Sequence, residues 1–508
     1  MRIVIHDGYD TIGGNKISVC SKDGCFLLDF GLNFSSWGNF FEEFVNPRTG
    51  KVIEDLLKLN LIPRIPIYRE DLAPSSLSFD GRYRFAFFSH AHADHIGLSG
   101  ILSGDLPFIL SKETLAISLV DSNMQGAKIW SKMMDKKRTR ECEGLVRNDV
   151  RCSPRKGEIL KRKVSVDLDD DAFEAVKVED VWEELKLFEV YHSIVGATAI
   201  AVKVENWWVV YTGDFKLRSL EDERDWKILF GERRMEISKR TWNFIESAKE
   251  LHPMILIVEG TTVTRGKPIR TSEMDVFENS LKLVERSKGL VLVDFPRRHV
   301  ERLLTFLKVA RETDRKLVLM PKDYAYVLKL EEIEPIWKLT NEERESLLVY
   351  HPASALFRGE ERKALEKALD EGIIVDHRDI ERDPGKFILS SGYWYITTLL
   401  DFNEKILKDS IYIHSTSEAY TEEQKIDAIR FGNWISHFGI EPHGLKIEND
   451  RIVFTGEFHS SGHAMPEDIE FVVGELDPEM IVPVHTQMKG WFVKKWKDKV
   501  KTDRVIEI

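Results

Sequence analysis

The feature that most constrains this chain is the run Ser89-His90-Ala91-His92-Ala93-Asp94-His95-Ile96-Gly97, which places four side chains of metal-binding type within six positions. Residues 83–88, just before it, are rich in aromatic residues and lack Gly and Pro, so they are predicted to form a buried strand. In extended backbone, alternate side chains point the same way, so His90, His92 and Asp94 can converge while His95 leaves in another direction. This arrangement favours two neighbouring cations, Zn²⁺ or alternatively Mn²⁺, over a polar turn with incidental histidines.

Composition describes a globular chain of more than one domain, because 508 residues with 43% hydrophobic and 31% charged content exceed one simple core. No apolar run approaches about 18 residues, and the N-terminus reads as a strand rather than a signal peptide, so we expect neither a membrane span nor secretion. The cysteines form no CxxC pair, which predicts neither a disulfide framework nor a cysteine zinc site. The expected compartment is the cytoplasm. The cysteines are Cys20, Cys25, Cys142 and Cys152.

The formal net charge of −12 argues mildly against a nucleic-acid partner, but the charge is segregated along the chain. Residues 131–163 carry 12 Lys or Arg against 5 Asp or Glu, whereas residues 167–184 carry 9 acids against one Lys. Two interpretations stay open: a solvated surface insertion whose halves pair with each other, and an arm that contacts RNA.

Hydrophobic patterning predicts strands in the first 234 residues and strand–helix alternation after them, which is typical of a parallel sheet. The predicted domains are residues 1–234, with insertions at about 35–80 and 125–184, then 235–415, then 416–508. Predicted strands cover residues 2–5, 16–20, 24–29, 185–191, 197–204, 207–211, 254–258, 289–294 and 316–320. Predicted helices cover residues 51–60, 112–140, 271–287 with Thr271 as N-cap, 299–312 and 421–437, and a hairpin is predicted at 444–455.

Further candidate ligands recur where predicted strands end: His192, Asp214 and His485. A single His after a strand is more often a satisfied polar residue than a ligand, so the argument rests on their recurrence. With the first cluster they make seven ligands, a suitable number for two cations that share one bridging carboxylate.

The order His-x-His-x-Asp-His, then His, Asp and His, resembles the metallo-β-lactamase superfamily. Asp29 matches the first motif of that superfamily, residues 90–95 the second, His192 the third and Asp214 the fourth. More narrowly, the chain resembles the β-CASP nucleases, the branch that contains ribonuclease J and the endonuclease that cleaves mRNA precursors at their 3′ ends. The three motifs of that branch look like Val258-Glu259-Gly260-Thr261-Thr262, Ser461-Gly462-His463-Ala464 and Pro483-Val484-His485.

The resemblance implies an α/β fold, a metallo-β-lactamase αββα sandwich with an inserted β-CASP α/β domain. It implies two Zn²⁺, with Asp214 as the bridge between them and Asp29 as structural support. One ion would be held by His90, His92 and His192, and the other by Asp94, His95 and His485. The implied reaction is hydrolysis of a phosphodiester by a metal-activated hydroxide, with His463 as general acid. Glu259 would orient His463 and favour its protonated form.

The resemblance also implies RNA, most simply single-stranded, as the substrate, because RNA-directed members carry His at the position of His485 where DNA-directed members usually carry Val. His459, Ser461 and Gly462 are expected at a helix start that could hold a phosphate. Arg297, Arg298 and Arg302 are candidate phosphate contacts, with a solvated helix face as the competing interpretation. Residues 293–300 depart from the Ser- and Asn-rich segment usual at this place in the family.

Three other functions compete with an RNA-directed nuclease: a hydrolase of small esters, thioesters, lactones or cyclic nucleotides, a DNA-directed β-CASP nuclease, and a non-catalytic RNA-binding relative. The inserted domain with Glu259 and His463 counts against the first, and the full ligand set counts against the last. Only a short segment follows His485, so we expect no additional C-terminal domain of the ribonuclease J kind, and a homodimer is left open. Exonuclease against endonuclease activity and its polarity are left open as well.

Overall fold

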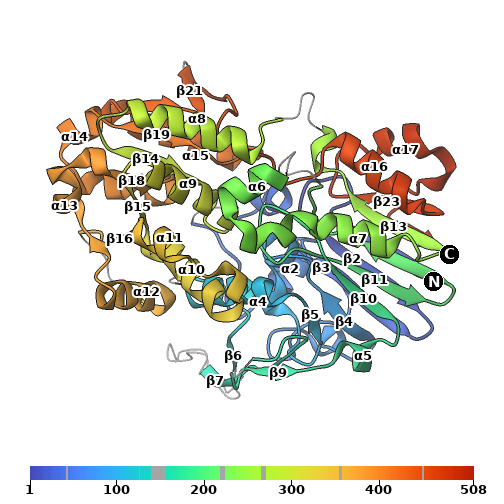
Figure 1. Cartoon of the computed structure of the whole chain (residues 1–508). Helices are drawn as coiled ribbons and strands as arrows, with labels where there is room; N and C mark the ends of the chain where they lie inside the picture. The colour runs from blue at the N-terminus through green and yellow to red at the C-terminus, as the bar shows by residue number, and fades with distance from the viewer. Residues whose placement is uncertain are drawn as a thin grey trace, which may run out of the picture.

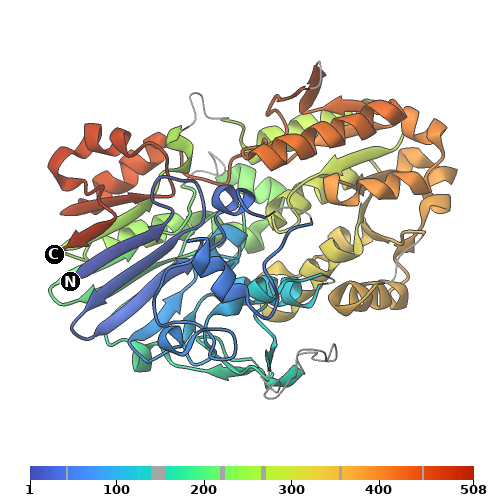
Figure 2. The same ribbon diagram turned by 180° about the vertical axis from the view of Figure 1, so that it is seen from behind.

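The computed structural model describes residues 1–41, 44–124, 126–138, 156–168, 170–217, 223–264, 270–353, 357–448 and 451–508. The chain forms two lobes, one with two packed sheets and one around a single sheet of seven strands (Figure 1, Figure 2). It starts in the first lobe, crosses to the second and returns. The two termini therefore lie side by side, where β1 (Arg2–Asp7) pairs with β24 (Val505–Glu507).

The two sheets of the first lobe pack face to face around one hydrophobic cluster that takes residues such as Phe26, Phe85 and Val202 from both sheets. The eight-stranded sheet has the order β24-β1-β2-β3-β4-β5-β8-β9, and the five-stranded sheet has the order β10-β11-β12-β13-β23. The strands are β2 (Lys16–Ser21), β3 (Gly24–Phe30), β4 (Tyr83–Phe87), β5 (Phe108–Ile109), β8 (Arg162–Val164), β9 (Phe173–Ala175), β10 (Leu185–Glu189), β11 (Thr198–Val204), β12 (Trp207–Tyr211), β13 (Met254–Glu259) and β23 (Met480–Val484). The strands predicted near residues 1–30, 83–88, 185–211 and 254–258 are confirmed.

Helices cover both outer faces of this sandwich. Apolar residues of α2 (Val52–Lys58) and α4 (Lys112–Asn123) share a cluster with the outer face of the first sheet. Those of α7 (Arg240–Ala248), α16 (Pro466–Leu476) and α17 (Lys489–Trp496) share one with the second sheet. The αββα sandwich that the resemblance implies is confirmed. The first lobe also holds α1 (Phe34–Gly38), α3 (Ala93–Ile96), α5 (Val178–Val181) and α6 (Glu223–Phe230), and none of the described helices has the length and apolarity to cross a membrane.

The second lobe is a parallel sheet with the order β17-β16-β15-β18-β14-β19-β20 and helices on both faces. Its strands are β14 (Val291–Asp294), β15 (Lys316–Leu319), β16 (Leu347–Tyr350), β17 (Ile374–Val375), β18 (Phe387–Ser390), β19 (Ile411–His414) and β20 (Glu441–His443). Its helices are α8 (Glu273–Arg286), α9 (Val300–Glu312), α10 (Pro321–Ile333), α11 (Asn341–Glu345), α12 (Gly359–Asp370), α13 (His377–Arg382), α14 (Glu404–Lys408) and α15 (Glu422–Phe438). A hairpin of β21 (Leu445–Glu448) and β22 (Arg451–Phe454) follows. The inserted unit was predicted to end at residue 415, but its edge strand β20 and the hairpin come later in the chain. We therefore propose that this unit ends after Phe454, the last residue of the hairpin.

Two helix predictions need correction. The helix predicted for residues 112–140 ends at Asn123, because Gly126 has a φ of +83° and the chain continues as a short strand, β6 (Lys136–Arg138). The N-cap of α8 is Ser272 rather than Thr271, and Ser272 forms a capping box with Asp275. Part of the basic block, residues 139–155, lies outside the described residues, so its two interpretations stay open.

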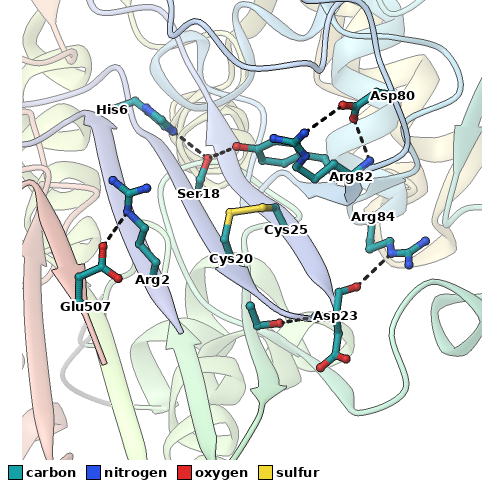
Figure 3. The surroundings of a disulfide bond; sticks show 12 residues. Arg2, His6, Ser18, Cys20, Asp23, Cys25, Asp80, Arg82, Arg84 and Glu507 are labelled. Carbon is teal, nitrogen blue, oxygen red and sulfur yellow. Dashed lines mark hydrogen bonds and ion pairs between the residues drawn. A yellow bond between two sulfur atoms is a disulfide. The ribbon is translucent and has the colours of Figure 1, made fainter.

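The cysteine spacing predicted no disulfide, and this prediction is wrong. Cys20 and Cys25 form one, across the hairpin of β2 and β3 (Figure 3). The two residues lie directly opposite each other in the ladder, with Cα atoms 4.1 Å apart. The turn between them determines this register, which a search for CxxC pairs does not detect. Cys142 and Cys152 lie outside the described residues.

Replacing both Cys20 and Cys25 by Ala should lower the free energy of unfolding by about 2 kcal/mol, the loop-closure contribution of so short a cross-link. Denaturant titration of the variant beside wild type, with and without reductant, measures this difference. Reduced wild type should match the variant. An unchanged midpoint in both would show that the bond does not stabilise the fold.

Candidate metal centre

The candidate functional residues of the second sheet lie where the carboxyl ends of its strands meet. Strand β10 is antiparallel to β11, and β11 is antiparallel to β12, while β12, β13 and β23 are parallel. The carboxyl ends of β10, β12, β13 and β23 therefore meet at the same edge of the sheet. The chain places a candidate residue just after or at each of these ends: His192, Asp214, Glu259 and His485.

The first sheet supplies the motif loop. His90 follows β4, His92 is the N-cap of α3, and Asp94 and His95 lie within that short helix. The loop packs tightly on the end of β3, because a Cβ atom on Gly31 would lie 1.6 Å from the carbonyl oxygen of Asp94. Only glycine fits this close approach. The parallel neighbours β3 and β4 thus hold the loop against the edge of the second sheet.

The seven predicted ligands meet in one place, and six of them form two groups of three. Nε2 of His90 lies 3.0 Å from Nδ1 of His92, which lies 3.3 Å from Nε2 of His192. Oδ2 of Asp94 lies 3.2 Å from Nε2 of His485 and 3.8 Å from Nε2 of His95. Each group has its ligand atoms within 4.8 Å of one another, the spacing of donors around a single cation.

Asp214 lies between the two groups. Its Oδ2 atom is 3.8 Å from Nε2 of His90 and 4.0 Å from that of His192 in the first group. The same atom is 3.1 Å from Nε2 of His95 and 3.8 Å from that of His485 in the second. Within the described part of the chain, its other oxygen, Oδ1, is buried and has no hydrogen-bond partner. Such an orphaned carboxylate oxygen among imidazoles fits a cation.

Asp29 and Ser89 orient the imidazoles of His90 and His95. Oδ2 of Asp29 accepts hydrogen bonds from Oγ of Ser89 at 2.8 Å and from Nδ1 of His95 at 2.7 Å. Because the Ser89 hydroxyl donates its proton to Asp29, its oxygen accepts from Nδ1 of His90 at 3.0 Å. Both histidines thus carry a proton on Nδ1 and turn Nε2 towards Asp214. Tyr211 also donates to Asp29, at 2.6 Å.

On the second sheet, too, Nδ1 of each histidine ligand is paired with an oxygen. Thr261 donates its hydroxyl proton to Glu259 at 2.6 Å, so its oxygen accepts from Nδ1 of His485 at 2.8 Å. The carbonyl oxygen of Gly462 accepts from Nδ1 of His192 at 2.6 Å. An oxygen on Nδ1 fixes the tautomer and directs the Nε2 lone pair at a cation, as outer partners do around metal-bound histidines.

The electrostatics differ between the two ligand groups. Burial lowers the pKa of His90 and His192 well below the usual value and that of His92 to about 4, so all three are neutral, the form that binds metal. Burial opposes the ionised form of Asp214, but the neighbouring imidazoles lower its pKa well below the ordinary range. The pKa of His95 is raised despite burial, because the carboxylates around it favour a positive charge.

His463 and Glu259 form a pair beside the cluster. Nδ1 of His463 lies 2.9 Å from Oε2 of Glu259 and 3.7 Å from Oδ2 of Asp214. The other oxygen of Glu259 accepts from the backbone N–H of Phe215 at 2.9 Å. Glu259 is buried, whereas the side chain of His463 stays 20% exposed, which leaves its Nε2 for a substrate.

The expected helix start at His459, Ser461 and Gly462 is wrong, since α16 begins at Pro466. These residues form a loop ahead of the helix. Oγ of Ser461 accepts from the backbone N–H of His463 at 3.2 Å, and a Cβ atom on Gly462 would collide with Ser193. The loop therefore positions His463 and His192. The predicted phosphate contact of the loop stays a prediction.

The three arginines differ in their surroundings. Arg302 is fully buried and forms an ion pair with Glu273 at 2.6 Å, so its predicted phosphate contact is wrong. Arg298 forms an ion pair with Asp121 at 2.6 Å and donates to the carbonyl oxygen of Ala91, inside the motif loop, at 3.0 Å. It thereby ties the second lobe to this loop. For Arg297 and Arg298 a phosphate contact stays a prediction.

Sequence reasoning missed the residues that orient the ligands: Ser89, Tyr211, Thr261 and the carbonyl group of Gly462. Ser89 directly precedes the motif at residues 90–95, and Thr261 lies two residues after Glu259, so a hydroxyl at such a place is a usable signal. A carbonyl group leaves no trace in a sequence, because every residue has one.

Comparisons with known proteins agree with this geometry. No protein-family model matches the chain. Ribonuclease J of Thermus thermophilus is 21% identical over 501 residues, which cover 98% of this chain and 70% of that protein. Ribonuclease J of Mycoplasma genitalium is 19% identical over 496 residues, which cover 96% of this chain and 68% of that protein. The chain is thus similar to ribonuclease J over nearly its whole length, as the resemblance to the β-CASP branch of the metallo-β-lactamase superfamily predicts.

The fold of this family is also found among solved structures. A protein of unknown function from Enterococcus faecalis matches with a TM-score of 0.62 and 22% identity, over 96% of this chain and 94% of that one. The likeness spans both lobes. The His and Asp clusters, together with the similarity to ribonuclease J, indicate that the chain uses a metal.

Replacing Thr261 by Val should weaken metal binding by about 10- to 100-fold, because it removes the oxygen that holds Nδ1 of His485. Competition with a zinc-responsive chelating dye measures the affinity. Thr313→Val, at the end of α9, is the matched control and should bind metal like wild type. Unchanged affinity in Thr261→Val would contradict the orienting role of this hydroxyl.

Proposed function

We propose that the chain is a ribonuclease that hydrolyses RNA phosphodiester bonds with the help of two Zn²⁺ ions. One observation carries this proposal: Oδ2 of Asp214 lies within 4.0 Å of an Nε2 atom in each of two ligand groups, the arrangement of a bridging carboxylate. The names of the relatives support RNA as the substrate. Mn²⁺ is the alternative metal, because the same donors accept it.

In this proposal one ion would be held by His90, His92 and His192, and the other by Asp94, His95 and His485, with Asp214 available to both. When bound, two such ions supply hydroxide near neutral pH for attack at phosphorus and stabilise the charge on the phosphate. Asp29 supports the site by fixing Ser89 and His95.

His463 is the proposed general acid. Cleavage leaves a 3′ oxygen that needs a proton, and His463 can give it from Nε2 while Nδ1 donates to Glu259. Glu259 is itself held by Thr261 and by the backbone of Phe215, so the imidazole keeps one orientation.

Single-stranded RNA is the proposed substrate form. A cavity of about 770 Å³ starts at His92 and continues into the second lobe, past Arg297, Arg298 and Lys322. A small ester would fit at the metal site alone. A nucleic-acid strand needs a longer cavity with cationic side chains beside its phosphates. Homodimer formation and location in the cytoplasm stay predictions.

Replacing Asp214 by Ala should abolish metal-dependent cleavage of end-labelled single-stranded RNA, and His92→Ala should do the same, while circular dichroism stays native. Both changes remove a proposed metal ligand. Full activity in either variant would contradict the metal assignment. DNA and a thioester assayed in parallel separate the RNA proposal from the two other hydrolase functions.

Replacing His463 by Ala should lower kcat by about 10²- to 10⁴-fold through loss of the general acid, with the metal content unchanged. Inductively coupled plasma mass spectrometry measures the metal, and added imidazole should restore part of the rate. Glu441→Gln, on the edge strand β20, is a control that should behave like wild type. Loss of metal from His463→Ala would show that this histidine is a ligand.

A further inference from the structure

The cavity that starts at His92 continues into the second lobe, where its lining residues take no part in the proposed hydrolysis. The whole cavity has a volume of about 770 Å³, within the range typical of sites for small organic ligands. From His92 it passes the carboxyl ends of β14 and β19, where parallel sheets bind ligands. Asp294 ends β14, and His414 ends β19.

Asp294 gives this pocket a carboxylate with a free oxygen. Tyr412 donates to Oδ2 of Asp294 at 3.2 Å, and no other hydrogen-bond donor to this carboxylate is found among the described residues. Gly392 packs against this carboxylate, since a Cβ atom there would come within 2.1 Å of Oδ1 and 2.7 Å of Oδ2. Only glycine leaves room for the carboxylate in this position.

An aromatic surface lies next to this carboxylate. Trp394 lines the same cavity, two residues after Gly392, and is 77% exposed. Its ring makes an edge contact with Tyr393, which Asp427 holds by a hydrogen bond of 2.8 Å. A large exposed ring at a cavity mouth is a stacking surface for an unpaired base.

We propose that this pocket binds one unpaired guanine of the RNA strand, with the base stacked on Trp394 and its Watson–Crick edge on Asp294. An ionised carboxylate only accepts hydrogen bonds, and guanine is the common base with two adjacent donors, N1–H and the N2 amino group, on that edge. Uracil, adenine and cytosine each present an acceptor to at least one of the carboxylate oxygens. This specificity rests on the proposed ribonuclease function and adds to it a preference for guanine near the cleaved bond.

The test compares two single-stranded oligouridylates in one tube, each with a different end label. One carries a single guanosine and the other carries inosine, which lacks the N2 amino group, at the same position. Wild type with Zn²⁺ or Mn²⁺ should consume the guanosine strand about tenfold faster for at least one position of the base, the discrimination expected of one paired edge. Product lengths then report the distance from the guanosine to the cleaved bond.

Asp294→Asn should bring the ratio of the two rates close to one, because the amide turns a donor towards the base. Gly392→Ala should do the same, because its methyl group would displace the carboxylate while the acid is kept. Asp370→Asn, exposed on α12, is the matched control and should keep the wild-type ratio and rate. Thermal melting of each variant confirms folding.

Equal consumption of both strands by wild type at every position overturns the guanine pocket and leaves the ribonuclease proposal standing. A guanosine preference that survives in both Asp294→Asn and Gly392→Ala overturns it as well. If wild type with either metal cuts neither strand, the ribonuclease proposal fails, and the pocket proposal fails with it.

Discussion

The metal centre depends on one repeated interaction, the hydrogen bond between Nδ1 of an imidazole and a fixed oxygen. Asp29, through Ser89 and directly, holds His90 and His95, while Thr261 holds His485. Each bond fixes the tautomer that turns Nε2 towards Asp214. Without these oxygens, buried imidazoles would leave polar atoms unpaired, at about 1–3 kcal/mol each, and could rotate away from a cation.

Strand direction explains why residues nearly 300 positions apart, such as His192 and His485, can share one site. The strands β10, β12, β13 and β23 end at one edge, so the residues that follow them converge whatever lies between in the chain. This is why the chain can leave the sandwich after β13, build the second lobe and return at β23 without disturbing the site. The second lobe in turn contributes Arg298 to the motif loop and borders the cavity that starts at His92.

Much of the site could be predicted from the sequence, because a ligand such as His90 or Asp214 shows its chemistry in its own residue type and its place in the site by following a strand. The outer contacts were harder to predict. The disulfide of Cys20 and Cys25 depends on the register of a hairpin, and the carbonyl group of Gly462 has no residue-specific signal. Arg302 shows the same limit, since an arginine on a helix reads as a surface cation until Glu273 is seen beside it.

The central claim is that two cations lie on either side of Oδ2 of Asp214. Crystals of the zinc-loaded protein, with diffraction data on both sides of the zinc absorption edge, test it most directly. The account predicts two anomalous peaks, one among His90, His92 and His192 and the other among Asp94, His95 and His485. No peak, or a single peak away from Asp214, would contradict it.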